Sequence, residues 1–332
     1  MASRSLRSSV ALALLVLALV STFGSLSAAS NLPEDAPFTV PKENMESSLK
    51  CIDAHEPMDK PGGVILLVHG TLSTPDVWFN YIKLLPTLRP GYDICHVNLP
   101  DFSLGDVQVT SEYVAFAIDS FAQKSATQKV KIISHSQGGL NTQWALTFWP
   151  SLRSKVDTFI ALAADFKGAK SAETACEEAC PIAYAQQKPN SNLIQALDSN
   201  QDCESGASAL VSTFSIYSES DNIVTPEFPP NEAASYLSGA KMIPIQSFCG
   251  EAYNLTHIPI VFDSSIYQIV QDVLEFKSFL PSRAKLPCQL QPPVPMDPNM
   301  MPKSPSLLRK SNLEPGLNAY VCSRGYATQC NP

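Results

Sequence analysis

Val130-Lys-Ile-Ile-Ser-His-Ser-Gln-Gly-Gly-Leu140 decides the fold, because this stretch is typical of a buried β-strand that turns sharply into a helix. Ser136 lies at the apex of the turn, and the pattern matches the G-x-S-x-G nucleophile elbow except that Ser134 replaces the first glycine. Gly138 and Gly139 allow the strand and helix backbones to pass close together. Ordinary turns also use Ser, Gly and Gln, so the motif needs support from the rest of the chain.

Apolar runs on both sides of this motif indicate further strands, and segments with helical spacing lie between them. Strands that alternate with helices predict an α/β fold with a mostly parallel central sheet, right-handed crossovers and flanking helices. The other expected strands are 64–68, 92–97, 158–163, 212–218 and 242–246, and the expected helices are 75–85, 112–121, 140–149, 193–197 and 264–280.

The first 29 residues are typical of a secretory signal peptide. Arg4 and Arg7 precede an apolar run over residues 10–20, and Ser27-Ala28-Ala29 resembles a cleavage site. The run is too short to span a bilayer comfortably, and no other segment approaches that length. We therefore expect a secreted, extracellular protein without an integral membrane segment.

The rest of the chain reads as one large domain with two irregular ends. Residues 30–62 are polar and dotted with proline, which favours an extended N-terminal arm. We expect the catalytic domain at 63–280, with a cap insertion at about 166–210 over the carboxyl edge of the sheet. The proline-rich segment 281–332 is expected to wrap around the surface.

Charge and cysteine content exclude several classes of function. Without Arg4 and Arg7, 21 basic residues face 31 acidic ones, a formal charge of −10 that disfavours nucleic acid as a partner. Nine cysteines fit an oxidising compartment, and the odd number leaves at least one unpaired within the chain. Because no cysteine or histidine cluster has zinc spacing, we expect no metal site.

A serine nucleophile needs a base within hydrogen-bond reach and an acid that orients the base. In this fold class the acid and then the histidine follow the serine in the chain. Only His257 comes late enough to be the base, and the side chain of His135 should diverge from its neighbour Ser136. The three histidines that precede this strand are His55, His69 and His96.

Asp221 is the preferred acid, because it follows the expected strand 212–218 directly. An aspartate in Ser-Asp-Asn can also serve only to cap its own turn. Glu219 is the nearest rival, and the remaining candidates are Asp157, Asp165, Asp198 and Asp202.

An ester-cleaving serine also needs preorganised donors for the oxyanion. The backbone N–H of Gln137, directly after the nucleophile, is the first expected donor. The loop His69-Gly70-Thr71 after the strand 64–68 supplies the second, and Thr71 can add its hydroxyl to its N–H.

With these residues in place, the sequence resembles the Candida antarctica lipase B-like family, a branch of the α/β-hydrolase fold. The similarity runs over roughly residues 63–279. It is densest in Ser136-Gln-Gly-Gly-Leu, Gln143-Trp-Ala-Leu-Thr-Phe-Trp-Pro-Ser-Leu-Arg-Ser-Lys-Val-Asp157, Asp165-Phe-Lys-Gly168, Gln108-Val-Thr-Ser-Glu-Tyr113, Ser220-Asp-Asn-Ile-Val-Thr-Pro226 and Cys249-Gly250.

The resemblance implies roles for the same residues. It assigns Ser136 as nucleophile, Asp221 as acid and His257 as base, with Thr71 and Gln137 as the oxyanion hole. It also implies that Asp165 and side chains around Gln187 lie near the acyl pocket, and we expect Asp165 to be a pocket residue. The implied disulfides are Cys51–Cys95 and Cys249–Cys288, and a looser match suggests Cys322–Cys330.

Two regions depart from the family pattern. Cys176, Cys180 and Cys203 in the insertion have no counterpart, so the insertion over the expected site departs from the family. Around His257, the segment Asn254-Leu-Thr-His-Ile also differs. It creates an N-x-S/T sequon, so we expect glycosylation at Asn254.

The sequence therefore predicts a secreted serine hydrolase that cleaves carboxylic esters, a triacylglycerol lipase or carboxylesterase. We expect a monomer that needs no cofactor and acts on a lipid or other ester, in solution or at a lipid–water interface. A short-chain or polyester-specific esterase is the alternative within the same chemistry. A secreted binding protein that keeps the fold without turnover is the alternative from another class.

Overall fold

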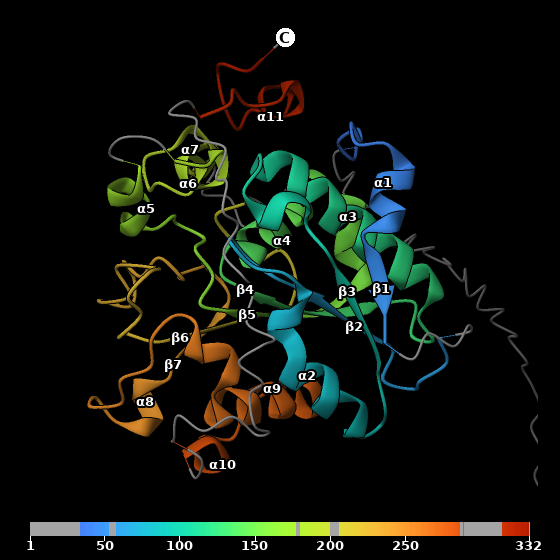
Figure 1. The fold of residues 1–332 in the computed structure, drawn as a ribbon, viewed down its shortest axis with the longest axis vertical. Helices are drawn as coiled ribbons and strands as arrows, with labels where there is room; N and C mark the ends of the chain where they lie inside the picture. The colour runs from blue at the N-terminus through green and yellow to red at the C-terminus, as the bar shows by residue number, and fades with distance from the viewer. Residues whose placement is uncertain are drawn as a thin grey trace, which may run out of the picture. The chain divides into compact units, whose positions relative to one another are not determined.

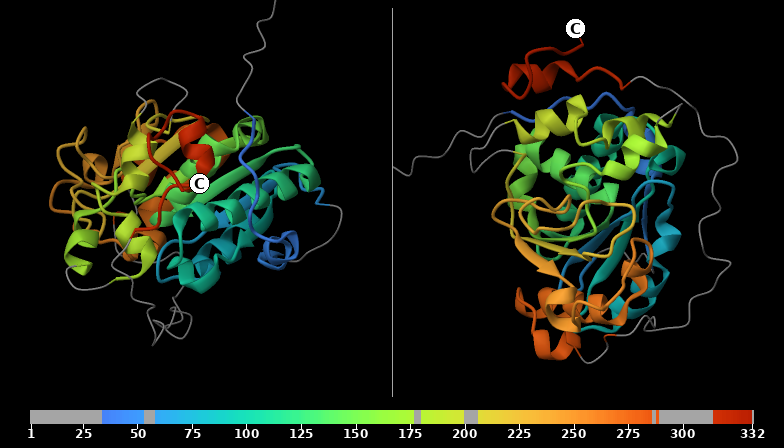
Figure 2. Two further views of the ribbon diagram at one scale, coloured as in Figure 1. Left: turned by 90° about the horizontal axis from the view of Figure 1, so that it is seen from above. Right: turned by 90° about the vertical axis from the view of Figure 1, so that its left-hand side faces the viewer.

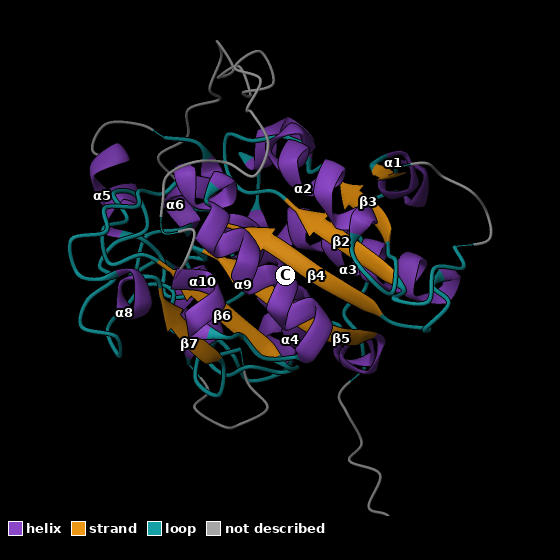
Figure 3. Cartoon of the chain, turned by 90° about the horizontal axis from the view of Figure 1, so that it is seen from below, coloured by secondary structure: helices purple, strands orange, loops and turns teal. Residues whose placement is uncertain are grey.

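The computed structural model describes residues 34–52, 58–176, 180–199, 206–285, 288 and 314–331. Within them, seven strands form one sheet in the order β1-β3-β2-β4-β5-β6-β7 (Figure 3). Only β1 runs antiparallel to its neighbour, so the predicted mostly parallel sheet is confirmed. The strands are β1 (Leu49–Cys51), β2 (Val64–Val68), β3 (Asp93–Val97), β4 (Val130–His135), β5 (Val156–Leu162), β6 (Thr213–Tyr217) and β7 (Lys241–Pro244).

The helices lie between the strands, as the alternating pattern predicted. α3 begins earlier than expected, because the Asp106 carboxylate caps its first turn by accepting from the Gln108 N–H at 2.9 Å. The helices are α1 (Lys42–Ser47), α2 (Phe79–Leu84), α3 (Val107–Lys124), α4 (Gln137–Phe148), α5 (Lys170–Ala175), α6 (Ile182–Gln186), α7 (Asn192–Asp198), α8 (Gln246–Cys249), α9 (Ser264–Phe276), α10 (Pro281–Lys285) and α11 (Ala319–Ser323).

Helices cover both faces of the sheet, which explains why the central strand β2 is apolar throughout. All five residues of β2 are buried. Val64, Leu66 and Val68 point into one core with α3 and α4, whereas Ile65 and Leu67 point into a second core with α2 and α9. Figure 1 shows these two pairs of helices on opposite sides of the sheet. Because β2 to β7 run parallel, their carboxyl ends lie together at one edge of the sheet.

Both ends of the domain contain regular structure that the local sequence pattern did not predict. The expected extended arm holds α1 and β1, and a disulfide joins Cys51 to Cys95 on the neighbouring strand. The C-terminal segment holds α10 and α11, of which α11 is red in Figure 2. Tyr320 of α11 lies against Phe148 of α4, with ring centroids 5.1 Å apart. The Trp144 indole N–H donates to the Tyr320 hydroxyl at 3.1 Å. These short elements are stabilised by partners distant in sequence, so local periodicity did not indicate them.

Four disulfides lie among the described residues. Three have the pairing that the resemblance implied, and the fourth joins two cysteines of the insertion. Cys203 and the signal peptide predicted at 1–29 lie outside the described residues. The disulfides are Cys51–Cys95, Cys249–Cys288, Cys322–Cys330 and Cys176–Cys180.

The expected insertion at 166–210 contains α5, α6 and α7 in its described parts. Its role as a cap stays a prediction. None of the helices described in the structure is both long and apolar enough to cross a membrane.

Candidate active site

Ser136 lies at the sharp turn between β4 and α4, as the elbow motif predicted. Its φ and ψ of 54° and −135° are rare for a residue with a side chain and cost about 1–3 kcal/mol. Two backbone hydrogen bonds hold it there. Its N–H donates to the Leu162 carbonyl on β5 at 2.9 Å, and its own carbonyl accepts from the Gly139 N–H at 2.8 Å. The sheet and the helix together therefore impose the strained conformation.

The loop after β2 passes very close to this turn, which explains the glycines. A Cβ atom at Gly70 would lie only 2.8 Å from the Cβ of Ser136. A Cβ at Gly138 would lie 2.6 Å from the Val68 carbonyl oxygen and 2.7 Å from that of His69. Because Gly70 and Gly138 have no side chains, the loop can approach the turn this closely, and Thr71, the residue after Gly70, lies beside the nucleophile.

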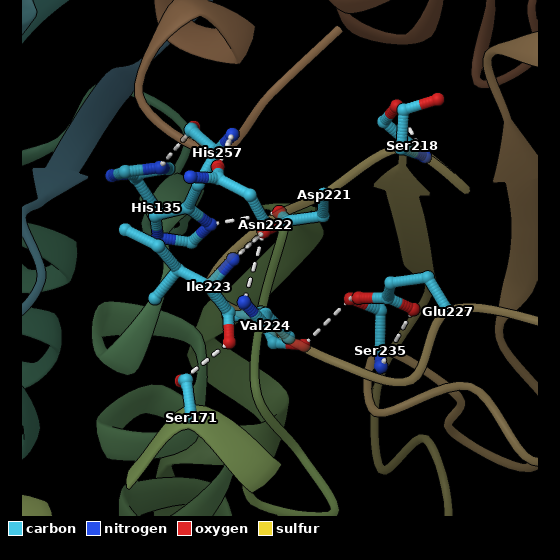
Figure 4. Close-up of polar contacts among 12 residues, drawn as sticks. His135, Ser171, Ser218, Asp221, Asn222, Ile223, Val224, Glu227, Ser235 and His257 are labelled. Atoms are coloured by element: carbon cyan, nitrogen blue, oxygen red, sulfur yellow. Dashed lines mark hydrogen bonds and ion pairs between the residues drawn. The ribbon is translucent and has the colours of Figure 1, made fainter. Parts of the chain in front are cut away.

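His257 and Asp221 form a buried hydrogen-bonded pair at 2.8 Å between Nδ1 and Oδ2 (Figure 4). The other carboxylate oxygen of Asp221 accepts from the N–H groups of Ile223 and Val224 at 2.8 and 2.9 Å. This leaves Oδ2 for the imidazole, and a carboxylate there stabilises the tautomer that carries its proton on Nδ1. Nε2 is then free to accept a proton from a hydroxyl group.

The other histidines are poorly suited to act as the base. His69 is fully buried, its Nε2 accepts from the Leu99 N–H at 3.0 Å, and burial lowers its pKa to about 4. Burial also lowers the pKa of His96 to about 4 and that of His135 well below its ordinary value. His55 lies outside the described residues. The structure therefore supports the choice of His257 that elimination made.

The rival acids have other surroundings. Asp157 forms ion pairs with Lys131 at 3.1 Å and Lys277 at 2.7 Å, away from the imidazole of His257. Asp202 lies outside the described residues. Asp221 forms an ion pair with His257, at 2.8 Å between Oδ2 and Nδ1.

Thr71 and Gln137, the predicted oxyanion donors, lie side by side. The Thr71 hydroxyl donates to the Gln137 side-chain oxygen, and it accepts from the Gln187 amide at 3.0 Å. That amide also donates to the Ala183 carbonyl at 3.0 Å, so α6 supports the loop after β2. Gln137 is the first residue of α4, where backbone N–H groups have no partner within the helix. The arrangement can supply donors to a negative oxygen beside Ser136.

A cavity of about 310 Å³ opens at this point. Both Ser136 and His257 line it, together with apolar side chains from both sides of the sheet edge. Asp165, predicted as a pocket residue, is not among the lining residues: it is fully buried, and burial raises its pKa to about 6. The cavity is lined by Thr71, Leu72, Ser73, Val77, His135, Ser136, Ala169, Ser171, Ala172, Tyr184, Gln187, Ile223, Val224, His257, Ile258 and Phe262.

The resemblance pointed to the neighbourhood of Gln187 but not to its hydrogen bond with Thr71. It also did not single out Tyr184, Ser171 or Asn222, which no motif marks. Asn254, the expected glycosylation site, is exposed three residues before His257. Its modification stays a prediction.

Two known proteins similar to this chain are both named lipase B. Comparison with models of known protein families gave no match. Lipase B of Pseudozyma antarctica is 37% identical over 229 residues, which cover 67% of this chain and 64% of that protein, slightly less than two thirds of its length. The crystal structure of Aspergillus fumigatus lipase B matches with a TM-score of 0.75 and 28% identity, over 87% of this chain and 74% of that one. The predicted resemblance and fold are thus confirmed.

Proposed function

We propose that this chain, which is similar to lipase B in sequence and fold, is a serine hydrolase that cleaves carboxylic esters, as a lipase or carboxylesterase. The observation that carries this proposal is that His257, in a buried pair with Asp221, lines the same cavity as the strained Ser136. A serine in an ordinary structural turn needs neither this strained backbone conformation nor a buried His–Asp pair nearby.

In the proposed reaction, Nε2 of His257 removes the hydroxyl proton of Ser136 as its Oγ attacks the ester carbonyl carbon. The C=O π electrons move onto oxygen, and the N–H groups of Thr71 and Gln137 stabilise that oxyanion. The imidazolium then protonates the leaving alcohol as the C–O bond breaks. Water repeats these steps on the acyl-enzyme, releases the acid and regenerates Ser136.

The cavity supports an ester with a hydrocarbon acyl group. Leu72, Val77, Ala172, Ile223 and Phe262 give it a largely apolar wall, which favours a hydrocarbon chain over a charged substrate. We also propose that the protein is secreted, because four disulfides are typical of an oxidising compartment.

A rate series on p-nitrophenyl esters tests the proposal. Wild type is expected to hydrolyse them, and Ser136→Ala is expected to lose at least about 1,000-fold in kcat. Rates that persist beyond the butyrate ester favour a lipase, and a collapse there favours a short-chain esterase. If wild type hydrolyses none of these esters faster than Ser136→Ala does, the chain is better interpreted as a binding protein without catalytic activity.

We further propose that the mouth of the cavity contacts a lipid–water interface. Ile223 and Ile258 line the cavity and still expose 39% and 41% of their surface. Exposed apolar side chains around a site are typical of a surface that meets lipid. The double variant Ile223→Ser/Ile258→Ser is therefore expected to lose about 10-fold more activity on emulsified triacylglycerol than on a dissolved p-nitrophenyl ester. Both side chains also line the cavity, so the ratio of the two losses is the quantity that tests interfacial contact.

The matched control is Leu280→Ser, which removes an equally exposed apolar side chain that does not line the cavity. It should leave both activities unchanged. Equal losses on emulsion and on dissolved ester in the double variant would argue against interfacial contact.

A further inference from the structure

His257 lies in a stretch with little regular structure, so its position depends on specific contacts. The chain between α8 and α9 contains only the short helical turn Pro259–Phe262. The Asp221 carboxylate holds the imidazole at Nδ1, yet one hydrogen bond to a ring does not fix the backbone beneath it. Because catalytic groups must be held within a fraction of an ångström, further contacts are required.

Two side chains hold the backbone of His257, one at each peptide group (Figure 4). The Asn222 side-chain oxygen accepts from the His257 N–H at 3.2 Å. The His135 Nε2 lies 3.2 Å from the His257 carbonyl oxygen. Since a carbonyl only accepts, His135 carries a proton on Nε2 and donates it.

Each of these side chains adjoins another member of the proposed triad. His135 ends β4, directly before Ser136, and Asn222 directly follows Asp221. The turn that carries Asn222 is itself fixed, because the Ser171 hydroxyl of α5 donates to the Ile223 carbonyl at 2.6 Å. The His135 contact therefore connects the loop that carries His257 to β4, which we call the nucleophile strand. The Asn222 contact connects the same loop to the turn at residues 221–224, which we call the acid turn.

His135 also packs against the imidazole of His257. The two ring centroids lie 4.7 Å apart and the planes meet at 35°. His135 is 2% exposed, and its burial favours the neutral ring. A neutral ring can lie against His257 when that side chain takes up the proton of Ser136, without repulsion between like charges.

We propose that His135 and Asn222 are positioning residues that hold His257 between the nucleophile strand and the acid turn. This inference rests on the proposed function of the site. His135, set aside as the base because neighbouring side chains on a tight turn diverge, contributes to the reaction through His257. Neither residue exchanges a proton with the substrate.

The test compares His135→Phe, which keeps an aromatic ring but removes the donor, with His135→Gln, whose amide can still donate to the His257 carbonyl. On p-nitrophenyl butyrate, His135→Phe and Asn222→Ala are each expected to lower kcat about 10- to 100-fold, with KM changed less than 3-fold. His135→Gln should recover most of the loss. The double variant His135→Phe/Asn222→Ala should lose less than the product of the single losses, because both contacts hold the same backbone.

A second readout does not depend on turnover. The exchange rate of the His257 Nδ1 proton, followed by NMR, should rise in His135→Phe and Asn222→Ala but not in His135→Gln. Unchanged exchange, or His135→Gln as impaired as His135→Phe in both readouts, would overturn the proposal. If wild type hydrolyses no ester, the proposed function fails, and the exchange measurement still decides whether the two side chains hold His257. Urea unfolding of each variant separates these effects from loss of the fold.

Discussion

Asp221→Asn is expected to lower kcat about 10,000-fold while the protein stays folded. The asparagine oxygen can still accept from the N–H groups of Ile223 and Val224. Its NH₂ group then faces Nδ1 of His257, where the carboxylate oxygen lies at 2.8 Å. Because NH₂ only donates, Nδ1 must become the acceptor, and the ring proton moves to Nε2. A protonated Nε2 cannot remove the proton of Ser136.

Steady-state kinetics on p-nitrophenyl butyrate measure this effect, and circular dichroism checks the fold. Asp157→Asn is the matched control, since that carboxylate pairs with Lys131 and Lys277 on another part of the domain. It should keep kcat within 3-fold of wild type. If Asp221→Asn retains more than a tenth of wild-type kcat, another group orients His257.

Gly138→Ala is expected to lower the free energy of unfolding by about 3 kcal/mol, the largest effect on stability among these variants. The new Cβ would lie 2.6 Å from the Val68 oxygen and 2.7 Å from the His69 oxygen. Both atoms belong to the backbone at the end of β2, so neither can rotate away. Either α4 or the loop that carries Thr71 must shift, and activity should fall as well.

Gly105→Ala provides the matched control, because a Cβ there would meet no atom within 4 Å. Urea unfolding should show a change below about 0.5 kcal/mol for this variant. A Gly138→Ala protein as stable as Gly105→Ala would mean that the strand and helix do not approach as closely as described.

The sequence predicted the centre of the fold well, because the physical signals there are local. β2 is a continuous apolar run and every residue of β4 except Lys131 is buried, since helices cover both faces of the sheet. The order of chain elements then limited the base to His257 and favoured Asp221, and the structure places these two in contact. Parallel strands bring their carboxyl ends to one edge, which is why residues distant in sequence meet.

Features that depend on contacts between distant segments were not predictable in this way. β1 pairs with β3, and α11 packs on α4 around Tyr320, yet neither segment has a strong period of its own. Asp165 shows that the resemblance also did not determine burial. The resemblance implied that Asp165 lies near the acyl pocket, whereas in the structure its side chain is fully buried and does not line the cavity. The contacts of His135 and Asn222 with His257 also depend on the folded arrangement.

Labelling with a fluorophosphonate, followed by peptide mapping, tests most directly whether Ser136 is a nucleophile activated by His257. This reagent forms a stable bond only with a serine whose proton is removed by a neighbouring base. We predict one label per chain on Ser136, none in Ser136→Ala, and much slower labelling in His257→Ala. No label on folded wild type, or a label that persists in Ser136→Ala, would contradict the account.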